Sequence, residues 1–84
     1  MAKYAKLLDT ILRGTADANI RFDDLHRLLL RLGFEVRIRG SHHIFRKKGV
    51  DAKLNLQRDG DKAKPYQVRQ VRAIIVQYRL AGRI

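Results

Sequence analysis

Two β-favouring stretches separated by Gly40-Ser41 constrain the fold of this chain more than any other feature. From Phe34 to Arg39, apolar residues alternate with charged ones. This is the period-two pattern of a strand with one buried face. A second β-favouring run, residues 42–47, follows at once. A Gly-Ser pair between two such runs is typical of a tight reversal, so the sequence predicts an antiparallel hairpin with Gly40 and Ser41 at its apex.

The segments before and after this hairpin have the apolar spacing of helices. Apolar residues at helical spacing predict three helices: Lys3–Arg13, a second from Phe22 to a stop at Gly33, and a third from Pro65 to an expected end at Gly82. A third strand is predicted at Lys53–Gln57, and residues 58–62 have the composition of a polar loop.

The order of these elements predicts an α+β fold. An antiparallel sheet with short connections can bury one face beneath helices and leave the other open. The last five elements, α-β-β-β-α, resemble the double-stranded-RNA-binding domain in topology, with a three-stranded antiparallel sheet and an extra N-terminal helix. We expect residues 1–84 to form a single domain, in which 1–19 are the N-terminal helix and connector and 20–84 the core.

Charge is the strongest compositional signal. Nineteen lysines and arginines against eight aspartates and glutamates give a net charge of +11. Such a charge favours a polyanionic partner, most often nucleic acid, although a solvated basic surface or an acidic protein partner would also account for it. The chain has no cysteine, which excludes thiolate catalysis and thiolate metal sites. No apolar run approaches the roughly 20 residues that span a bilayer, and no signal-peptide pattern is present, so we expect a cytoplasmic protein with no membrane partner.

Two histidines follow the hairpin apex directly. Histidine is the side chain best suited to transfer protons near neutral pH. Strand alternation sends His42 and His43 to opposite faces, so at most one of them points with any given catalytic group. Alternation does not choose between them, because Ile44 and Phe45 are both credible core residues.

The segment around the apex resembles a known family. A helix ending in Leu32-Gly33-Phe34 and a basic strand leading to Gly40-Ser41-His42-His43-Ile44-Phe45 are similar to the HicA toxins of bacterial and archaeal toxin–antitoxin operons. The resemblance runs from about Phe22 to Leu80. It implies a fold like the double-stranded-RNA-binding domain, metal-independent cleavage of mRNA without a cofactor, and neutralisation by a cognate HicB-like antitoxin. It also implies that the functional histidine is His42, with His43 as the runner-up.

Three features depart from the family pattern. Many members carry a further histidine after a Val-Pro pair near the third strand, where this chain reads Lys53-Leu54-Asn55-Leu56-Gln57-Arg58. The last helix opens with Pro65-Tyr66-Gln67-Val68 instead of a Gly-Thr entry. The first predicted helix extends beyond the compact core of typical members.

The predicted chemistry needs a proton-transfer group among cations. The RNA 2′-hydroxyl can attack the adjacent phosphate, a histidine can move the proton, and arginines or lysines can stabilise the developing charge. The candidate RNA-binding residues are Arg37, Arg39, Arg46, Lys47, Lys62, Lys64, Arg69 and Arg72. The histidines have no metal-ligand spacing, so no metal is expected. Three hypotheses remain: a HicA-like endoribonuclease toxin, a catalytically silent module that binds nucleic acid, and a DNA-binding accessory protein.

Overall fold

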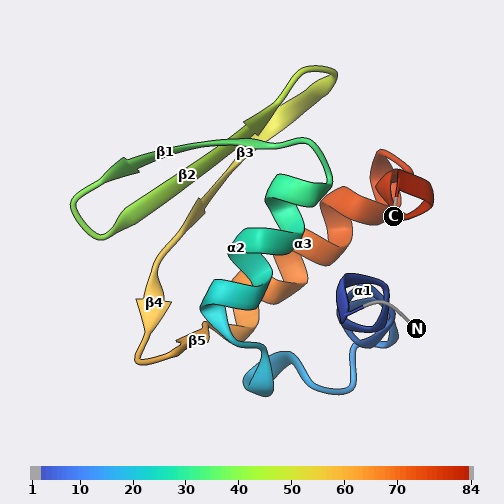
Figure 1. Ribbon diagram of the computed structural model, residues 1–84, viewed down its shortest axis with the longest axis horizontal. Coiled ribbons are helices and arrows are strands. Elements are labelled where there is room, and N and C mark those ends of the chain that lie inside the picture. Colours follow the sequence, from blue (N-terminus) through green and yellow to red (C-terminus); the bar gives the residue numbers. More distant parts are fainter. Residues whose placement is uncertain (1–2, 84) are drawn as a thin grey trace.

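The chain folds as a helical layer packed against one face of a small sheet (Figure 1). A computed structural model describes residues 3–83. The elements in chain order are α1 (Lys3–Arg13), the 3-10 turn η1 (Asp17–Asn19), α2 (Phe22–Arg31), β1 (Glu35–Arg39), β2 (His42–Lys47), β3 (Val50–Leu56), β4 (Arg58–Asp59), β5 (Lys62–Ala63), α3 (Pro65–Gln77) and the 3-10 turn η2 (Leu80–Arg83). Within residues 3–83, no helix has the length and apolarity needed to cross a membrane.

The main sheet is antiparallel, with strand order β1-β2-β3. Helices α2 and α3 lie against one face of it, and α1 packs on the far side of those two helices (Figure 1). We call the face toward the helices the inner face and the opposite one the open face. The predicted α+β class, the α-β-β-β-α order and the three-stranded sheet are therefore confirmed.

The first hairpin turns at the predicted residues. Arg39 and His42 are the last cross-strand partners of β1 and β2, which leaves Gly40 and Ser41 as a two-residue turn. Gly40 has a φ of 57°, and a left-handed glycine at the first central position fits a type II′ turn. The apex of this hairpin projects beyond the helices. Ile38 lies on the inner face, opposite His43, yet its side chain remains 57% exposed because no helix covers it there.

Three boundaries differ from those predicted. Strand β3 begins at Val50 instead of Lys53, because pairing with Lys47 extends it. The predicted polar loop is a small hairpin, β4–β5, that turns at Gly60. Helix α3 ends at Gln77 and not near Gly82: Arg79 has a φ of 53°, in the left-handed region where an α-helix cannot continue.

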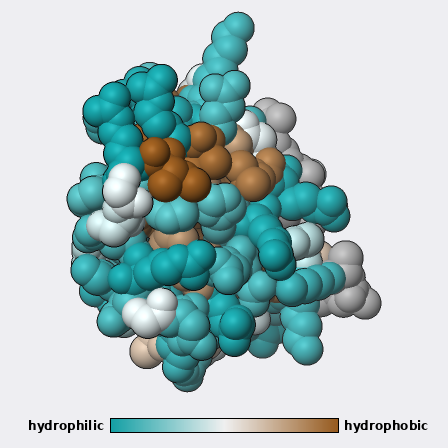
Figure 2. Space-filling view, turned by 60° about the vertical axis from the view of Figure 1, so that its left-hand side comes forward, coloured by the Kyte–Doolittle hydropathy of each residue, from teal (hydrophilic) through white to brown (hydrophobic). Residues whose placement is uncertain are grey.

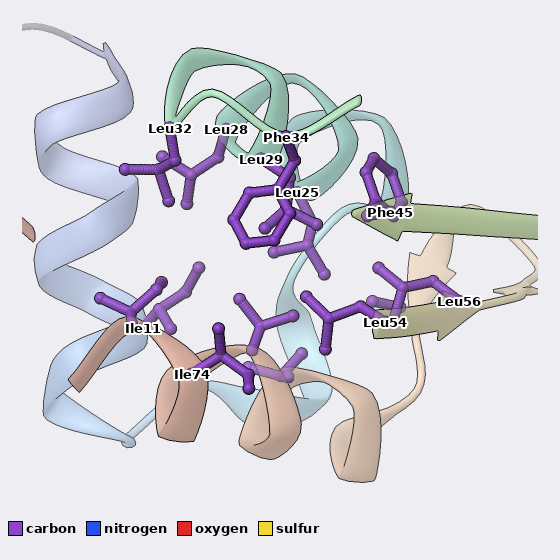
Figure 3. Close-up of a cluster of buried hydrophobic side chains, with 14 of the residues drawn as sticks. Ile11, Leu25, Leu28, Leu29, Leu32, Phe34, Phe45, Leu54, Leu56 and Ile74 are labelled. Carbon is purple, nitrogen blue, oxygen red and sulfur yellow. The ribbon is translucent and has the colours of Figure 1, made fainter. Parts of the chain in front are cut away.

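The core unites all three helices with the sheet (Figure 3). Helix α1 contributes Leu8 and Ile11 to the same cluster as the sheet's Phe45, and Ile11 is completely buried. The remaining buried apolar residues are Ile20, Phe22, Leu25, Leu28, Leu29, Leu32, Phe34, Leu54, Leu56, Ala63, Val68, Val71, Ile74, Ile75 and Leu80. The extra N-terminal helix is thus part of the core packing and not an appendage to it.

A buried amide joins α3 to the end of β3. Gln67 is only 1% exposed. In the amide orientation that pairs donors with acceptors, its nitrogen donates to the carbonyl of Gln57 at 3.0 Å and its oxygen accepts from the Gln57 N–H at 2.9 Å. The side chain therefore acts as a strand partner for Gln57, which explains how a polar residue is accommodated on the buried side of α3.

An arginine fastens the N-terminal segment to α3. The guanidinium of Arg72 donates to both carboxylate oxygens of Asp17, at 2.9 and 3.1 Å, and to the carbonyl of Ile11 at 3.1 Å. The hydrogen bond to Asp17 raises the pKa of Arg72. This single side chain holds the end of α1 and the η1 turn against the last helix.

Candidate active site and nucleic-acid interface

His42 and His43 lie on opposite faces of β2, as alternation predicts. Cross-strand pairing places His42 beside Arg39 and places His43 between Ile38 and Leu56, which belongs to the core. His42 is exposed and His43 is half-buried. Of these two histidines, His42 is therefore the one that a large substrate could reach from the open face.

The imidazole of His42 contacts Asn55 on β3. Its Nδ1 lies 3.1 Å from Oδ1 of Asn55. Two residues further along the chain, the Gln57 amide donates to the hydroxyl of Ser41 at 3.1 Å. These two hydrogen bonds join the hairpin apex to the third strand, so His42 projects from a sheet and not from a free loop.

A row of cations continues along the open face from His42. Arg37, Arg39 and Arg46 lie there together with Lys53, and all four side chains are exposed. They surround a shallow hollow of about 540 Å³ whose other lining residues include Ile44 and Glu35. Within residues 3–83 none of these four cations forms an ion pair. Their charge is thus available to an anionic ligand.

The surrounding surface is also polar. Figure 2 brings forward the end of the molecule at which β1 and β2 are joined, and hydrophilic side chains dominate it apart from one compact apolar patch. A surface of this composition suits a charged, hydrated ligand better than a nonpolar one.

His43 has a very different environment on the inner face. Its ring packs edge-on against Phe22, with centroids 4.8 Å apart, and against the ring of His26 at 5.3 Å. Its Nδ1 is buried and has no hydrogen-bond partner within residues 3–83. Burial lowers the pKa of His43, and Arg58 lowers it further. Burial therefore disfavours the charged form of this ring, and its neighbours confine it.

His26 and the residues beside it complete this inner cluster. Burial, followed by the charge of His43, lowers the pKa of His26, while Asp23 acts in the opposite direction. Arg58 lies over the Phe22 ring, 4.7 Å from its centroid, and its hydrogen bond to Asp23 lowers the pKa of that carboxyl. Two histidines with lowered pKa values thus lie close to the Arg58–Asp23 ion pair.

The other predicted cations fall into two groups away from the open face. Lys47 points to the inner side of the sheet, where its Nζ lies close to Gly33 at the end of α2. Lys62 and Lys64 lie in β5 and directly after it, and Arg69 lies in the first turns of α3. Lys62 donates to Asn19 at 3.1 Å. The predicted RNA-binding residues therefore do not form one continuous patch.

Arg72, also predicted to bind RNA, is engaged within the fold. Its guanidinium is occupied by Asp17 and by the Ile11 carbonyl, and its side chain is 24% exposed. The donors that a phosphate would need are already directed at protein acceptors. Arg72 is therefore better described as a structural residue than as an RNA ligand.

Two residues of the site are not singled out by the sequence pattern. Asn55 contacts His42 and Lys53 extends the cationic row, yet the pattern indicates only that both belong to a strand. Alternation with the buried Leu54 and Leu56 already places Asn55 and Lys53 on the outer side. Their proximity to the site depends on the register between β2 and β3, which in turn depends on where β3 begins.

No metal-binding cluster is found near these histidines or elsewhere in the described chain. Residues 3–83 contain no group of three or more histidine, aspartate or glutamate side chains placed to hold a metal ion. The groups that the site presents are imidazole, amide, guanidinium and ammonium.

The comparison with known families bears on this site directly. Residues 22–81 match the family model described as "HicA toxin of bacterial toxin-antitoxin". No curated protein and no solved structure matches the chain. The family match covers more than half of the 84 residues and includes α2, the whole sheet with His42, and α3. The chain therefore belongs to the HicA family of toxins from bacterial toxin–antitoxin systems.

Proposed function

We propose that this protein is an endoribonuclease toxin that cleaves mRNA with His42 as the proton-transfer group and without a metal ion. The observation that carries the proposal is the position of His42. It is exposed on a cationic sheet face, opposite Arg39, with one ring nitrogen held by Asn55 and the other available. Membership of a toxin family agrees with a destructive activity of this kind.

The chemistry follows from the groups present. Nε2 of His42 takes the proton of an RNA 2′-hydroxyl as that oxygen attacks the adjacent phosphorus. The bond from phosphorus to the 5′-oxygen breaks, and the departing oxygen takes a proton from water. The products are a 2′,3′-cyclic phosphate and a 5′-hydroxyl end. Proton transfer of this type contributes about 100- to 10,000-fold to a rate. Arg39 is the nearest cation along the strand pair and stabilises the added negative charge of the transition state.

Substrate binding uses the cations already described. Arg37 and Arg46 continue the row from Arg39 along the open face, and Lys62, Lys64 and Arg69 form a second cluster at the start of α3. Lysines and arginines that contact phosphates displace condensed counterions, which makes such binding favourable at low salt. The toxin acts on mRNA in the cytoplasm, and a HicB-like antitoxin neutralises it.

The alternative is a silent module that binds RNA with the same cations but does not cut it. Its lack of activity would be consistent with the absence of a further histidine in Lys53–Arg58. A DNA-binding accessory role is a third outcome. The endoribonuclease requires His42 and the RNA 2′-hydroxyl, whereas neither alternative cuts. Cleavage therefore separates the first hypothesis from the other two, and binding of RNA against DNA separates those two.

The test is cleavage of a labelled RNA in EDTA by wild type, His42→Ala and His43→Phe. We expect cyclic-phosphate products from the wild type, none from His42→Ala, and near-normal cleavage by His43→Phe, since phenylalanine preserves the packing of that ring. A DNA strand of the same sequence should remain intact. Binding of RNA by His42→Ala should stay close to that of the wild type.

Each contrary result has a definite meaning. If His43→Phe is inactive and His42→Ala cuts normally, the mechanism survives and the assignment passes to His43. If the purified wild type binds RNA but never cuts it, the silent module replaces the toxin. If both DNA and RNA are bound equally and neither is cut, the accessory role is favoured.

A further inference from the structure

The hydrogen bond between His42 and Asn55 has a defined donor and a defined acceptor. An amide oxygen carries no hydrogen and can only accept. With Oδ1 of Asn55 facing the ring, as in this structure, the hydrogen bond forms when Nδ1 of His42 bears the proton. In a neutral imidazole only one nitrogen is protonated, which leaves Nε2 with a free lone pair. The contact thus selects one of the two tautomers of the ring.

We infer that Asn55 is a positioning residue that holds His42 in the tautomer whose Nε2 can accept a proton. The assignment rests on the proposed function, because it concerns the same site. Without the amide, the ring would exchange between two tautomers and rotate about its Cβ–Cγ bond. A fraction of molecules would then present an N–H, which cannot act as a base, toward the 2′-hydroxyl.

The fold makes Asn55 suitable for this role. Its two neighbours in β3, Leu54 and Leu56, are 3% and 0% exposed and anchor the strand from the inner face. Asn55 is the cross-strand partner of Ile44, so it lies diagonally across from His42 on the same face. Side chains that project from anchored strands are placed more accurately than side chains on loops.

A purely structural role is the competing explanation. The same hydrogen bond joins β3 to the hairpin apex and would be removed with the side chain whether or not the tautomer matters. The Gln57–Ser41 bond provides a matched comparison, because it also joins an amide on this segment to the hairpin apex but does not touch a histidine.

The activity experiment compares Asn55→Leu, Asn55→Asp and Gln57→Leu in single-turnover RNA cleavage across pH. Asn55→Leu has a similar size but no acceptor. We expect the rate to fall about 10- to 100-fold, by analogy with the loss of a partner that orients a metal-bound histidine. Asn55→Asp keeps an acceptor and adds a charge that favours the protonated ring. It should recover the rate, with a pH–rate profile displaced to higher pH. Gln57→Leu should cut at nearly the wild-type rate.

A second measurement reads the tautomer without relying on activity. The imidazole ¹⁵N chemical shifts of His42, recorded at a pH where the ring is neutral, should show protonated Nδ1 in the wild type and in Gln57→Leu. In Asn55→Leu the two nitrogen signals should move toward each other as the tautomers mix. A change of folding would alter signals throughout the protein instead.

The outcomes separate this assignment from the proposed function. The role of Asn55 is disproved if Asn55→Leu cuts normally while His42→Ala is inactive. It is also disproved if the His42 ¹⁵N shifts in Asn55→Leu match those of the wild type. In both cases the proposed endoribonuclease activity remains. If Gln57→Leu loses as much activity as Asn55→Leu, the effect is structural and the assignment also fails. If the wild type does not cut at all, both proposals fall together.

Discussion

His42 and His43 are neighbours in sequence, yet their imidazoles occupy opposite sides of β2. His42 faces solvent and an amide oxygen, whereas His43 packs against Phe22 and its buried Nδ1 has no hydrogen-bond partner in the described part of the chain. The same residue type thus has two distinct physical roles one position apart. Their contributions to activity and to stability are therefore separable by substitution.

The stability of the protein should decrease in mild acid. The pKa values of His26 and His43 are lowered from their ordinary value of 6.5, chiefly by burial. Below that value the unfolded chain binds more protons than the folded one, so the free energy of unfolding falls as pH drops through the folded pKa values. Urea denaturation between about pH 8 and pH 5 measures this slope, in the range where histidines titrate.

Replacement of His43 by phenylalanine provides the control. His43→Phe keeps an aromatic ring beside Phe22 and removes both the unbonded nitrogen and one of the two mutually repelling groups. The dependence of unfolding free energy on pH should become shallower, and stability at neutral pH should not decrease. Identical slopes in the two proteins would mean that His43 does not contribute to the pH dependence.

The salt dependence of RNA binding should reveal which cations bind phosphates. We compare Arg37→Gln/Arg46→Gln with Lys64→Gln/Arg69→Gln in the non-cleaving His42→Ala background. Removal of one cation that neutralises a phosphate should reduce the slope of log K against log salt by about 0.7 for a single strand, so each double variant should reduce it by about 1.4. A cluster whose removal leaves the slope unchanged does not belong to the interface.

The two clusters should differ in their effect on cleavage. With His42 present and RNA saturating, the open-face variant should cut more slowly because Arg37 and Arg46 align the strand near the histidine. The variant at the start of α3 should weaken binding but preserve the saturated rate. A wild-type affinity that does not vary with salt would contradict the polyanion interpretation altogether.

The N-terminal helix should be required for stability. Ile11 is completely buried, so Ile11→Ala should lower the free energy of unfolding by about 2–5 kcal/mol. Leu12 is 38% exposed, and Leu12→Ala should cost less than about 1 kcal/mol. Urea denaturation with unchanged m-values checks both. Equal, small effects would show that α1 contributes little to the core.

An acidic protein partner should bind the open face and suppress toxicity. The net charge of +11 and the row at Arg37, Arg39 and Arg46, which form no ion pair within residues 3–83, provide the complementary surface. Co-expression with the protein encoded beside the toxin gene should give a stable complex and restore growth, and Arg39→Glu should weaken that complex. Harmless expression of the toxin alone would argue against an antitoxin-controlled role.

Elements with a strong local signal are predictable from the sequence, and those set by tertiary contacts are not. Helix α1 and strand β2 have the expected bounds, since apolar spacing and the Gly40-Ser41 turn determine them locally. The predicted end of α3 is wrong because the true end depends on Arg79, a residue with no intrinsic preference for the left-handed region. The β4–β5 hairpin is not predicted because its two-residue strands are too short to show alternation.

In the candidate site, too, the features set by local sequence are predictable and those set by tertiary contacts are not. Alternation and the motif place His42 and His43 on opposite faces, and Arg39 next to the apex. The pairing of His42 with Asn55 depends on the offset between β2 and β3, which includes an irregularity between Phe45 and Lys47 that sequence periodicity does not reveal. The ion pair that occupies Arg72 joins residues 55 positions apart and leaves no local pattern.

That ion pair has a consequence for how the toxin fold is delimited. The family match begins at residue 22 and includes Arg72, but the partners of this arginine, Asp17 and the Ile11 carbonyl, lie before the match. A shortened chain cut at the family boundary would expose the core surface that Ile11 covers and leave a guanidinium without its acceptors. The region matched by the family model is therefore shorter than the set of residues that pack together in this protein, so a shortened version should retain α1 and η1.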